Sequence, residues 1–149
     1  MKIAYLVSHF SAASHTFIRR EVAALRSLGT DISVFSVQHD KAAGDAVISL
    51  LGRSPFTYLG ALIKALISEP RQFAGSWVLA LEHRPRGIRA LLWSQFHFIE
   101  AIFLGRMMRA QRIAHLHCHF ANSGATVGMI ATNYAGIPFS LTLHGISET

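Results

Sequence analysis

Short apolar segments alternate with an amphipathic helical segment at the start of the chain, and this alternation restricts the fold more than any other feature. The apolar or β-branched segments 3–7 and 32–37 predict two strands. Between them, apolar side chains recur every three or four positions in residues 17–28, and Gly29 follows where a glycine commonly ends a helix. Strand, helix and strand in this order predict a βαβ unit, whose two strands are parallel.

The same alternation returns near the end of the chain. Residues 113–119 predict a strand and residues 122–134 a helix. Residues 139–143 predict a further strand, after the turn-forming sequence Gly136-Ile137-Pro138. The two ends together predict the α/β class, with a Rossmann-like, doubly wound parallel sheet.

The middle of the chain predicts helices instead of strands. The expected helices are divided by Pro55, Pro70 and Pro85, and they cover residues 42–51, 56–68, 71–81 and 88–110. We therefore expect a helical insertion between the second and third strands, within a single domain that spans residues 1–149.

The net charge of +6 is concentrated in the basic helical insertion, residues 53–112, which carries nine basic and three acidic side chains. The rest of the chain carries five of each, so it is neutral. A local basic excess predicts an anionic partner, unless it is only a solvated helical face. The candidate partners are a membrane surface, a phosphorylated substrate or a nucleic acid. No nucleic-acid-binding motif is present, so we expect an anionic membrane surface and no nucleic acid.

An apolar stripe runs along the last helix of the insertion. We expect it to pack in the core rather than against a membrane; it consists of Leu91, Leu92, Phe96, Ile99, Phe103 and Met107. No segment of the sequence is apolar enough over a sufficient length to predict a signal peptide or a membrane span. These features predict a cytoplasmic protein with peripheral contact to the inner face of the plasma membrane.

Several classes of function are excluded by what the sequence lacks. Cys118 is the single cysteine, which excludes a disulfide scaffold and a cysteine-rich zinc module. The expected first loop, residues 8–14, contains no glycine, which argues against a dinucleotide-binding site. The sequence also has no Gly-Lys-Ser/Thr phosphate loop and no Gly-x-Ser-x-Gly nucleophile elbow.

Three histidines alternate along the strand expected over residues 113–119. His115, His117 and His119 should share one face, because side chains two positions apart in a strand point the same way. Such a face could hold zinc or copper, with His144 as a further ligand and Glu148 as the nearest expected carboxylate. The alternative is that the histidines fill space or bond to the backbone. Cys118 should face the opposite side as a packed thiol.

Polar residues gather where the expected strands end. His144 and Gly145 follow the last strand, and ligands of open α/β sheets bind outside the carboxyl ends of the strands. Ser14, Thr16 and Asn122 stand where helices begin at the same edge, so their hydroxyl or amide groups could bind an anion or a sugar.

Two stretches of the chain also resemble a known family. Residues 1–8 with 14–21, and residues 115–126 with 136–145, resemble family 4 glycosyltransferases of the bacterial exopolysaccharide and colanic-acid type. The resemblance implies the amino-terminal, acceptor-side half of a two-domain GT-B fold. It implies a retaining, metal-independent transfer from a nucleotide sugar, which is a substrate, with no cofactor.

On this resemblance we expect the acceptor-side domain of a hexosyltransferase in polysaccharide biosynthesis. His144 would be catalytic, beside the donor sugar, and no residue would bind a metal. The expected substrate-binding residues are Ser14, Thr16, Phe17, His119, Asn122 and Gly145. The expected partners are a donor-binding second domain in cis or in trans, a nucleotide sugar, a lipid-linked or saccharide acceptor, and an anionic membrane through residues 53–112. Because the chain stops at Thr149, we expect a truncated half that is inactive alone.

Two alternatives remain open from the sequence. One is a metal-binding protein or metallohydrolase fragment that uses His115, His117 and His119. The other is a non-catalytic module that binds a membrane or a partner chain through the basic helices.

Overall fold

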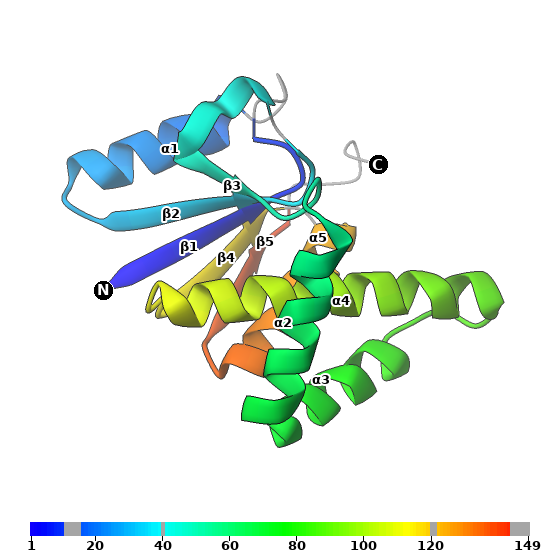
Figure 1. Ribbon diagram of the computed structural model, residues 1–149. Coiled ribbons are helices and arrows are strands. Elements are labelled where there is room, and N and C mark those ends of the chain that lie inside the picture. Colours follow the sequence, from blue (N-terminus) through cyan, green and yellow to red (C-terminus); the bar gives the residue numbers. More distant parts are fainter. Residues whose placement is uncertain (11–15, 40, 120–121, 144–149) are drawn as a thin grey trace.

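Five parallel strands form one sheet in the computed structural model, which describes residues 1–10, 16–39, 41–119 and 122–143 (Figure 1). The strands lie in the order β3-β2-β1-β4-β5, and every neighbouring pair is parallel. Their bounds are β1 (Lys2–Val7), β2 (Asp31–Ser36), β3 (Val47–Ser49), β4 (His115–His119) and β5 (Phe139–Thr142).

Helices cover both faces of this sheet. In Figure 1, α1 lies on one face, and α4 and α5 lie on the other, with α2 and α3 packed outside them. This arrangement confirms the Rossmann-like, doubly wound α/β class. The helix bounds are α1 (Thr16–Ser27), α2 (Pro55–Ser68), α3 (Pro70–Glu82), α4 (Ile88–Ala110) and α5 (Ser123–Ala135).

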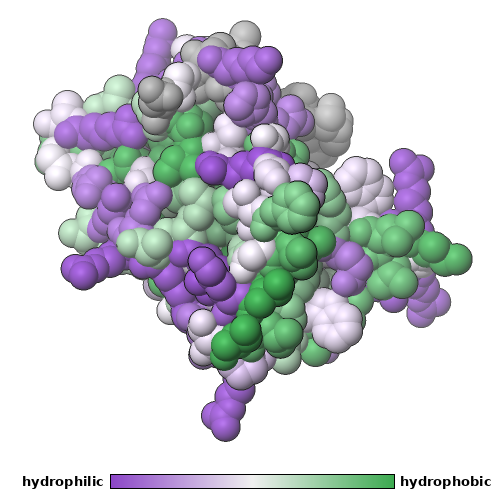
Figure 2. Space-filling view, viewed as in Figure 1, coloured by the Kyte–Doolittle hydropathy of each residue, from purple (hydrophilic) through white to green (hydrophobic). Residues whose placement is uncertain are grey.

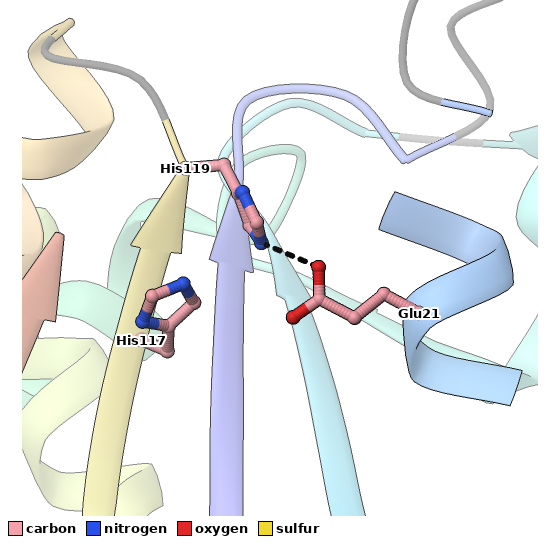
Figure 3. Close-up of side chains that lie close together, drawn as sticks. All are labelled: Glu21, His117 and His119. Carbon is pink, nitrogen blue, oxygen red and sulfur yellow. Dashed lines mark ion pairs between the residues drawn. The ribbon is translucent and has the colours of Figure 1, made fainter. Parts of the chain in front are cut away.

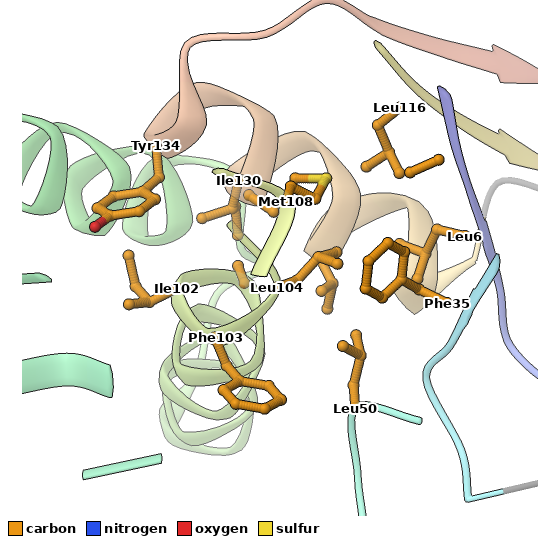
Figure 4. Packing of buried hydrophobic residues seen from close by; sticks show 14 of the residues in the cluster. Leu6, Phe35, Leu50, Ile102, Phe103, Leu104, Met108, Leu116, Ile130 and Tyr134 are labelled. Carbon is orange, nitrogen blue, oxygen red and sulfur yellow. The ribbon is translucent and has the colours of Figure 1, made fainter. Parts of the chain in front are cut away.

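Alternation along β1 separates two apolar cores. Tyr5 and Val7 face α1, where Ile18 and Val22 are buried against them. Ala4 and Leu6 face the other way, toward the larger core beneath α4 and α5. Figure 4 shows the side chains of this larger core, among them Leu6, Phe35, Leu104, Ile130 and Tyr134.

The helix expected over residues 42–51 was wrong. A short 3-10 segment, Lys41–Ala46, is interrupted at Gly44, whose φ of 65° leaves the helical region. The β-branched residues that follow form β3 and pair with β2, with Val47 beside Val34. The helical insertion therefore follows β3, and the sheet has one strand more than expected.

The insertion itself is helical and is divided as expected. Pro55 and Pro70 are the first residues of α2 and α3, and Pro85 lies between α3 and α4. The apolar stripe expected on α4 is only half correct. Phe103 is 7% exposed and joins the core, whereas Leu92 is 66% exposed on the part of α4 that extends beyond it. In the part of the chain that the structure describes, no helix combines the length and the apolar character that crossing a bilayer requires.

Candidate functional site

Three ionisable side chains meet near the carboxyl edge of the sheet. Glu21 comes from α1, and His117 and His119 come from β4 (Figure 3). One ligand-type atom from each lies within 4.8 Å of the others, and His119 Nε2 is 3.6 Å from Glu21 Oε2. His119 is buried, whereas Glu21 and His117 are half-buried. The group is therefore partly accessible through Glu21 and His117.

Tyr5 of β1 contacts all three members of this group. Its hydroxyl donates a hydrogen bond to Glu21 Oε1 at 2.5 Å, and its ring lies 5.2 Å from the ring of His117 and 5.6 Å from that of His119. Burial, together with the hydrogen bond and the charge of Glu21, raises the pKa of the Tyr5 phenol well above its ordinary range. Tyr5 therefore stays a hydrogen-bond donor that holds the Glu21 carboxylate in place.

A chain of hydrogen bonds links the histidines to β5. The hydroxyl of Ser140 lies 2.7 Å from His115 Nε2 and 2.6 Å from His117 Nδ1. Thr142 Oγ1 lies 3.1 Å from His117 Nε2 on the other side of the same ring. A hydroxyl has one proton, so it can donate to only one of the two histidines, and at least one of them must donate to Ser140. The common face expected for the histidines is confirmed, and their tautomers are coupled through Ser140.

Within the described ranges, the set of residues that could hold a metal differs from the one expected. Among the described residues, the atoms close enough to share an ion belong to Glu21, His117 and His119, and His115 lies outside this group. Sequence reasoning missed Glu21, although it stands one helical turn after Phe17, a residue already expected at the site. The two expected ligands His144 and Glu148 lie outside the described residues.

Asn122 connects the start of α5 to the end of β1. Its Oδ1 accepts a hydrogen bond from the Gly124 N–H at 3.0 Å, which confirms it as a helix N-cap. Its Nδ2 donates to Ser8 Oγ at 2.9 Å. This bond joins two loops that are distant in sequence, so Asn122 lies at the expected edge of the sheet.

The other expected binding residues divide into two groups. Thr16 begins α1, and its hydroxyl accepts a hydrogen bond from Arg19 at 3.3 Å. The ring of Phe17 meets that of His119 edge to face, with centroids 5.8 Å apart. The structure thus brings together Phe17 and His119 near the acidic partner Glu21. The remaining expected residues, Ser14, His144 and Gly145, lie outside the described residues.

The single cysteine takes no part in this site. Cys118 is 1% exposed and faces away from the histidines into the larger core. Burial raises the pKa of its thiol to about 12, so it is not ionised near neutral pH. The expected packed thiol is confirmed.

Comparison of the chain with protein-family models, with curated proteins and with solved structures gives no match.

Proposed function

We propose that this chain is the acceptor-side domain of a retaining glycosyltransferase that uses a nucleotide sugar. The observation that carries the proposal is the convergence of hydrogen-bonding side chains at the carboxyl edge of a parallel sheet. Asn122 reaches the end of β1, and Glu21 and His119 lie near the same edge. Open α/β sheets bind their ligands at this edge. The sequence resemblance to family 4 glycosyltransferases supports the choice of a sugar as ligand.

The chemistry of the site suits a sugar acceptor. Sugar hydroxyls both donate and accept hydrogen bonds, so they need a mixed set of partners. The carboxylate of Glu21 accepts, the amide of Asn122 donates, and an imidazole does either according to its tautomer. The ring of Phe17 is partly exposed beside His119 and offers an apolar face. In this proposal these residues orient the acceptor, and His144 stands beside the donor sugar.

A titration followed by NMR tests the proposal. The purified chain is titrated with methyl glycosides of glucose, galactose and mannose, while the ring signals of the histidines are followed. We expect at least one glycoside to shift the signals of His117 and His119. His83, on the exposed end of α3, is the internal control and should not shift. Shifts at His83 alone, or at none of the three, would refute the proposal.

We also propose that the domain sits on an anionic membrane. An apolar-basic surface covers the outer sides of α2, α3 and the first half of α4, where twelve large apolar side chains are exposed. Figure 2 shows the part of this surface that follows α2 as a continuous ridge. The apolar members are Phe56, Leu59, Ile63, Leu66, Ile67, Trp77, Val78, Ile88, Leu91, Leu92, Trp93 and Phe96.

The positive charge of this surface favours a bilayer of anionic lipids as its partner. Exposed basic side chains lie among the apolar ones, on α2, on α3 and at the start of α4: Lys64, Arg71, Arg86 and Arg89. An apolar ridge with basic residues beside it is typical of helices that lie in the membrane interface. Each basic side chain near an anionic surface contributes about 1 kcal/mol. These contributions are screened by salt, whereas the apolar contribution is not.

Binding to vesicles of defined composition distinguishes an anionic membrane from other partners of the apolar-basic surface. We expect the chain to float with vesicles of phosphatidylcholine and phosphatidylglycerol, less with phosphatidylcholine alone, and less when salt is raised. The double substitution Ile63→Glu and Leu66→Glu should weaken binding about tenfold or more, since it places two charges on the ridge. Leu28→Glu is the matched control, because Leu28 is 80% exposed after α1, away from α2. Equal losses in both variants, or self-association in place of vesicle binding, would contradict the proposal.

A second candidate function, metal binding, has one specific observation in its favour. Glu21, His117 and His119 place ligand atoms within 4.8 Å of one another, and two histidines with a carboxylate are a common set for zinc or iron. Zinc analysis of a tag-free preparation tests it. Stoichiometric zinc that is lost in His119→Ala and retained in His115→Ala would support a metal protein. A zinc-free preparation that takes up no added zinc would exclude it.

A further inference from the structure

A groove of about 710 Å³ runs along the first half of α4, between that helix, the segments that follow β2 and β3, and the start of α5. Its walls include Gln38, Leu92, Trp93, Phe96 and Ser123. The groove is separate from the group formed by Glu21, His117 and His119, none of which lines it.

One carboxylate lines this groove. Glu100 lies on the same face of α4 as Arg89, Trp93 and Phe96, because residues three, four and seven positions apart share a helix face. Glu100 lies eleven positions after Arg89, which is about 16 Å along the helix at 1.5 Å per residue. Arg89 is exposed and Glu100 is buried, so the groove runs from a cationic outer end to an inner end that carries a carboxyl group.

One carboxylate oxygen of Glu100 lacks a hydrogen-bond partner among the residues that the structure describes. It is only 3% exposed, and its Oε2 is buried without a hydrogen bond to any of them. A buried carboxylate without a donor is strongly destabilising. Burial accordingly raises the pKa of Glu100 to about 7. Glu100 is not part of the apolar stripe expected on α4, so nothing in the sequence predicted its burial beside a groove.

We propose that the groove binds a neutral saccharide, with Glu100 accepting a hydrogen bond from a sugar hydroxyl. The rings of Trp93 and Phe96 pack against the C–H face of the sugar, since aromatic faces attract weakly positive C–H groups. An apolar wall with a few polar groups is the usual character of a ligand site. The inference rests on the proposed function: the sheet-edge residues hold one sugar ring of the acceptor, and the groove, which Ser123 lines next to Asn122, holds a second part of the same saccharide.

An apolar ligand alone would not fit the inner end of the groove. An alkyl chain would cover Trp93 and Phe96, but it would leave the Glu100 carboxylate buried without a donor. A hydroxylated ring satisfies both requirements. This difference makes the type of ligand testable.

Fluorescence of Trp93 reports on the groove directly. The chain has two tryptophans, so the variant Trp77→Phe leaves Trp93 as the only source of tryptophan emission. In that background the probes are maltose, cellobiose, lactose and the methyl glycosides of glucose, galactose and mannose, with n-hexanol as the apolar probe. We expect at least one saccharide to change Trp93 emission with a saturable dependence.

The substitution Glu100→Gln tests the carboxylate while keeping the shape of the side chain. In titrations above pH 7, where the Glu100 carboxyl is ionised, we expect saccharide affinity to fall at least tenfold, because hydrogen bonds to a charged group are about twice as strong as neutral ones. Glu82→Gln, on the exposed end of α3, is the control and should leave affinity unchanged. Circular dichroism of both variants establishes that they are folded.

Three outcomes would overturn the inference. They are a Trp93 signal that no saccharide changes, an unchanged saccharide affinity in folded Glu100→Gln, and a response to n-hexanol that exceeds the response to every saccharide. Failure of the groove is distinguishable from failure of the proposed function. If a glycoside shifts the NMR signals of His117 and His119 but not the emission of Trp93, the acceptor binds at the sheet edge and the groove proposal alone is refuted.

Discussion

A methyl group added at Gly105 would test the packing of α4 on α5. Built at this position, a Cβ would lie 2.6 Å from Cδ1 of Tyr134 and 3.1 Å from the carbonyl oxygen of Ala131. Tyr134 is completely buried and cannot move away without cost. The Arg109 guanidinium donates to its carbonyl oxygen at 3.1 Å and lies over its ring. The two helices must therefore separate, or the ring must leave its place.

The expected loss of stability follows from two opposing contributions. Overpacking of a tight core lowers the free energy of unfolding by about 1–3 kcal/mol. A clash with both a fixed ring and a backbone oxygen should give a loss at the upper end of this range. Replacement of glycine by alanine within a helix stabilises the folded state by about 1 kcal/mol, because alanine has the higher helix propensity. Gly105→Ala should therefore lower the free energy of unfolding by about 2 kcal/mol. For a domain of this length, that lowers the melting temperature by roughly 4–8 °C.

Gly75→Ala is the matched control, because Gly75 lies within α3 and a Cβ there would meet nothing within 4 Å. This variant should gain up to about 1 kcal/mol. Urea unfolding, followed by circular dichroism, measures both variants against the unmodified chain. If Gly105→Ala is as stable as Gly75→Ala, α4 does not approach α5 as closely as described, and the reasoning is refuted.

Three further predictions concern the buried polar groups. Because the pKa of Glu100 is raised to about 7, its proton is bound more tightly in the folded state, so stability should fall as pH rises from about 4.5 to 7. Glu100→Gln should remove this part of the pH dependence. If the variant and the unmodified chain lose the same stability over this pH range, the prediction is wrong. Cys118 should react with a thiol reagent such as DTNB only after unfolding, and rapid reaction of the folded chain would show that it is not buried. Tyr5→Phe should lower the free energy of unfolding by about 1 kcal/mol, because it removes the hydrogen bond to Glu21, whose carboxylate is still reached by water, and the loss should shrink in a Glu21→Gln background. Equal costs in both backgrounds would mean that the two side chains are not coupled.

The strands and helices at both ends of the chain could be predicted because each has a clear apolar period. Every expected strand and helix there is present, with bounds that differ by one or two residues. The strand β3 could not be predicted in the same way. Val47–Ser49 is only three residues long, and its extended form depends on pairing with β2. Local sequence carries little information about such a segment, because its partner lies elsewhere in the chain.

The site was only partly predictable for a related reason. The shared face of His115, His117 and His119 follows from the period of a strand, which is a local property. The approach of Glu21 depends on how α1 is rotated over the sheet, and that is set by the packing of Ile18 and Val22. A carboxylate on a helix is expected on the solvent side unless the packing face is known, so Glu21 and Glu100 were both overlooked.

The groove and the apolar-basic surface share part of α4, and this limits what kind of acceptor could serve both proposals. Leu92, Trp93 and Phe96 line the groove and are also exposed on the surface. If that surface rests on a bilayer, the groove opens beside the lipid, with Arg89 at its outer end and Glu100 at its inner end. A saccharide that reaches Glu100 would then have its other end near Arg89 and the membrane. This geometry fits a saccharide joined through a phosphate to a lipid better than a free sugar, because a lipid anchor would keep the local concentration of the sugar high at the groove.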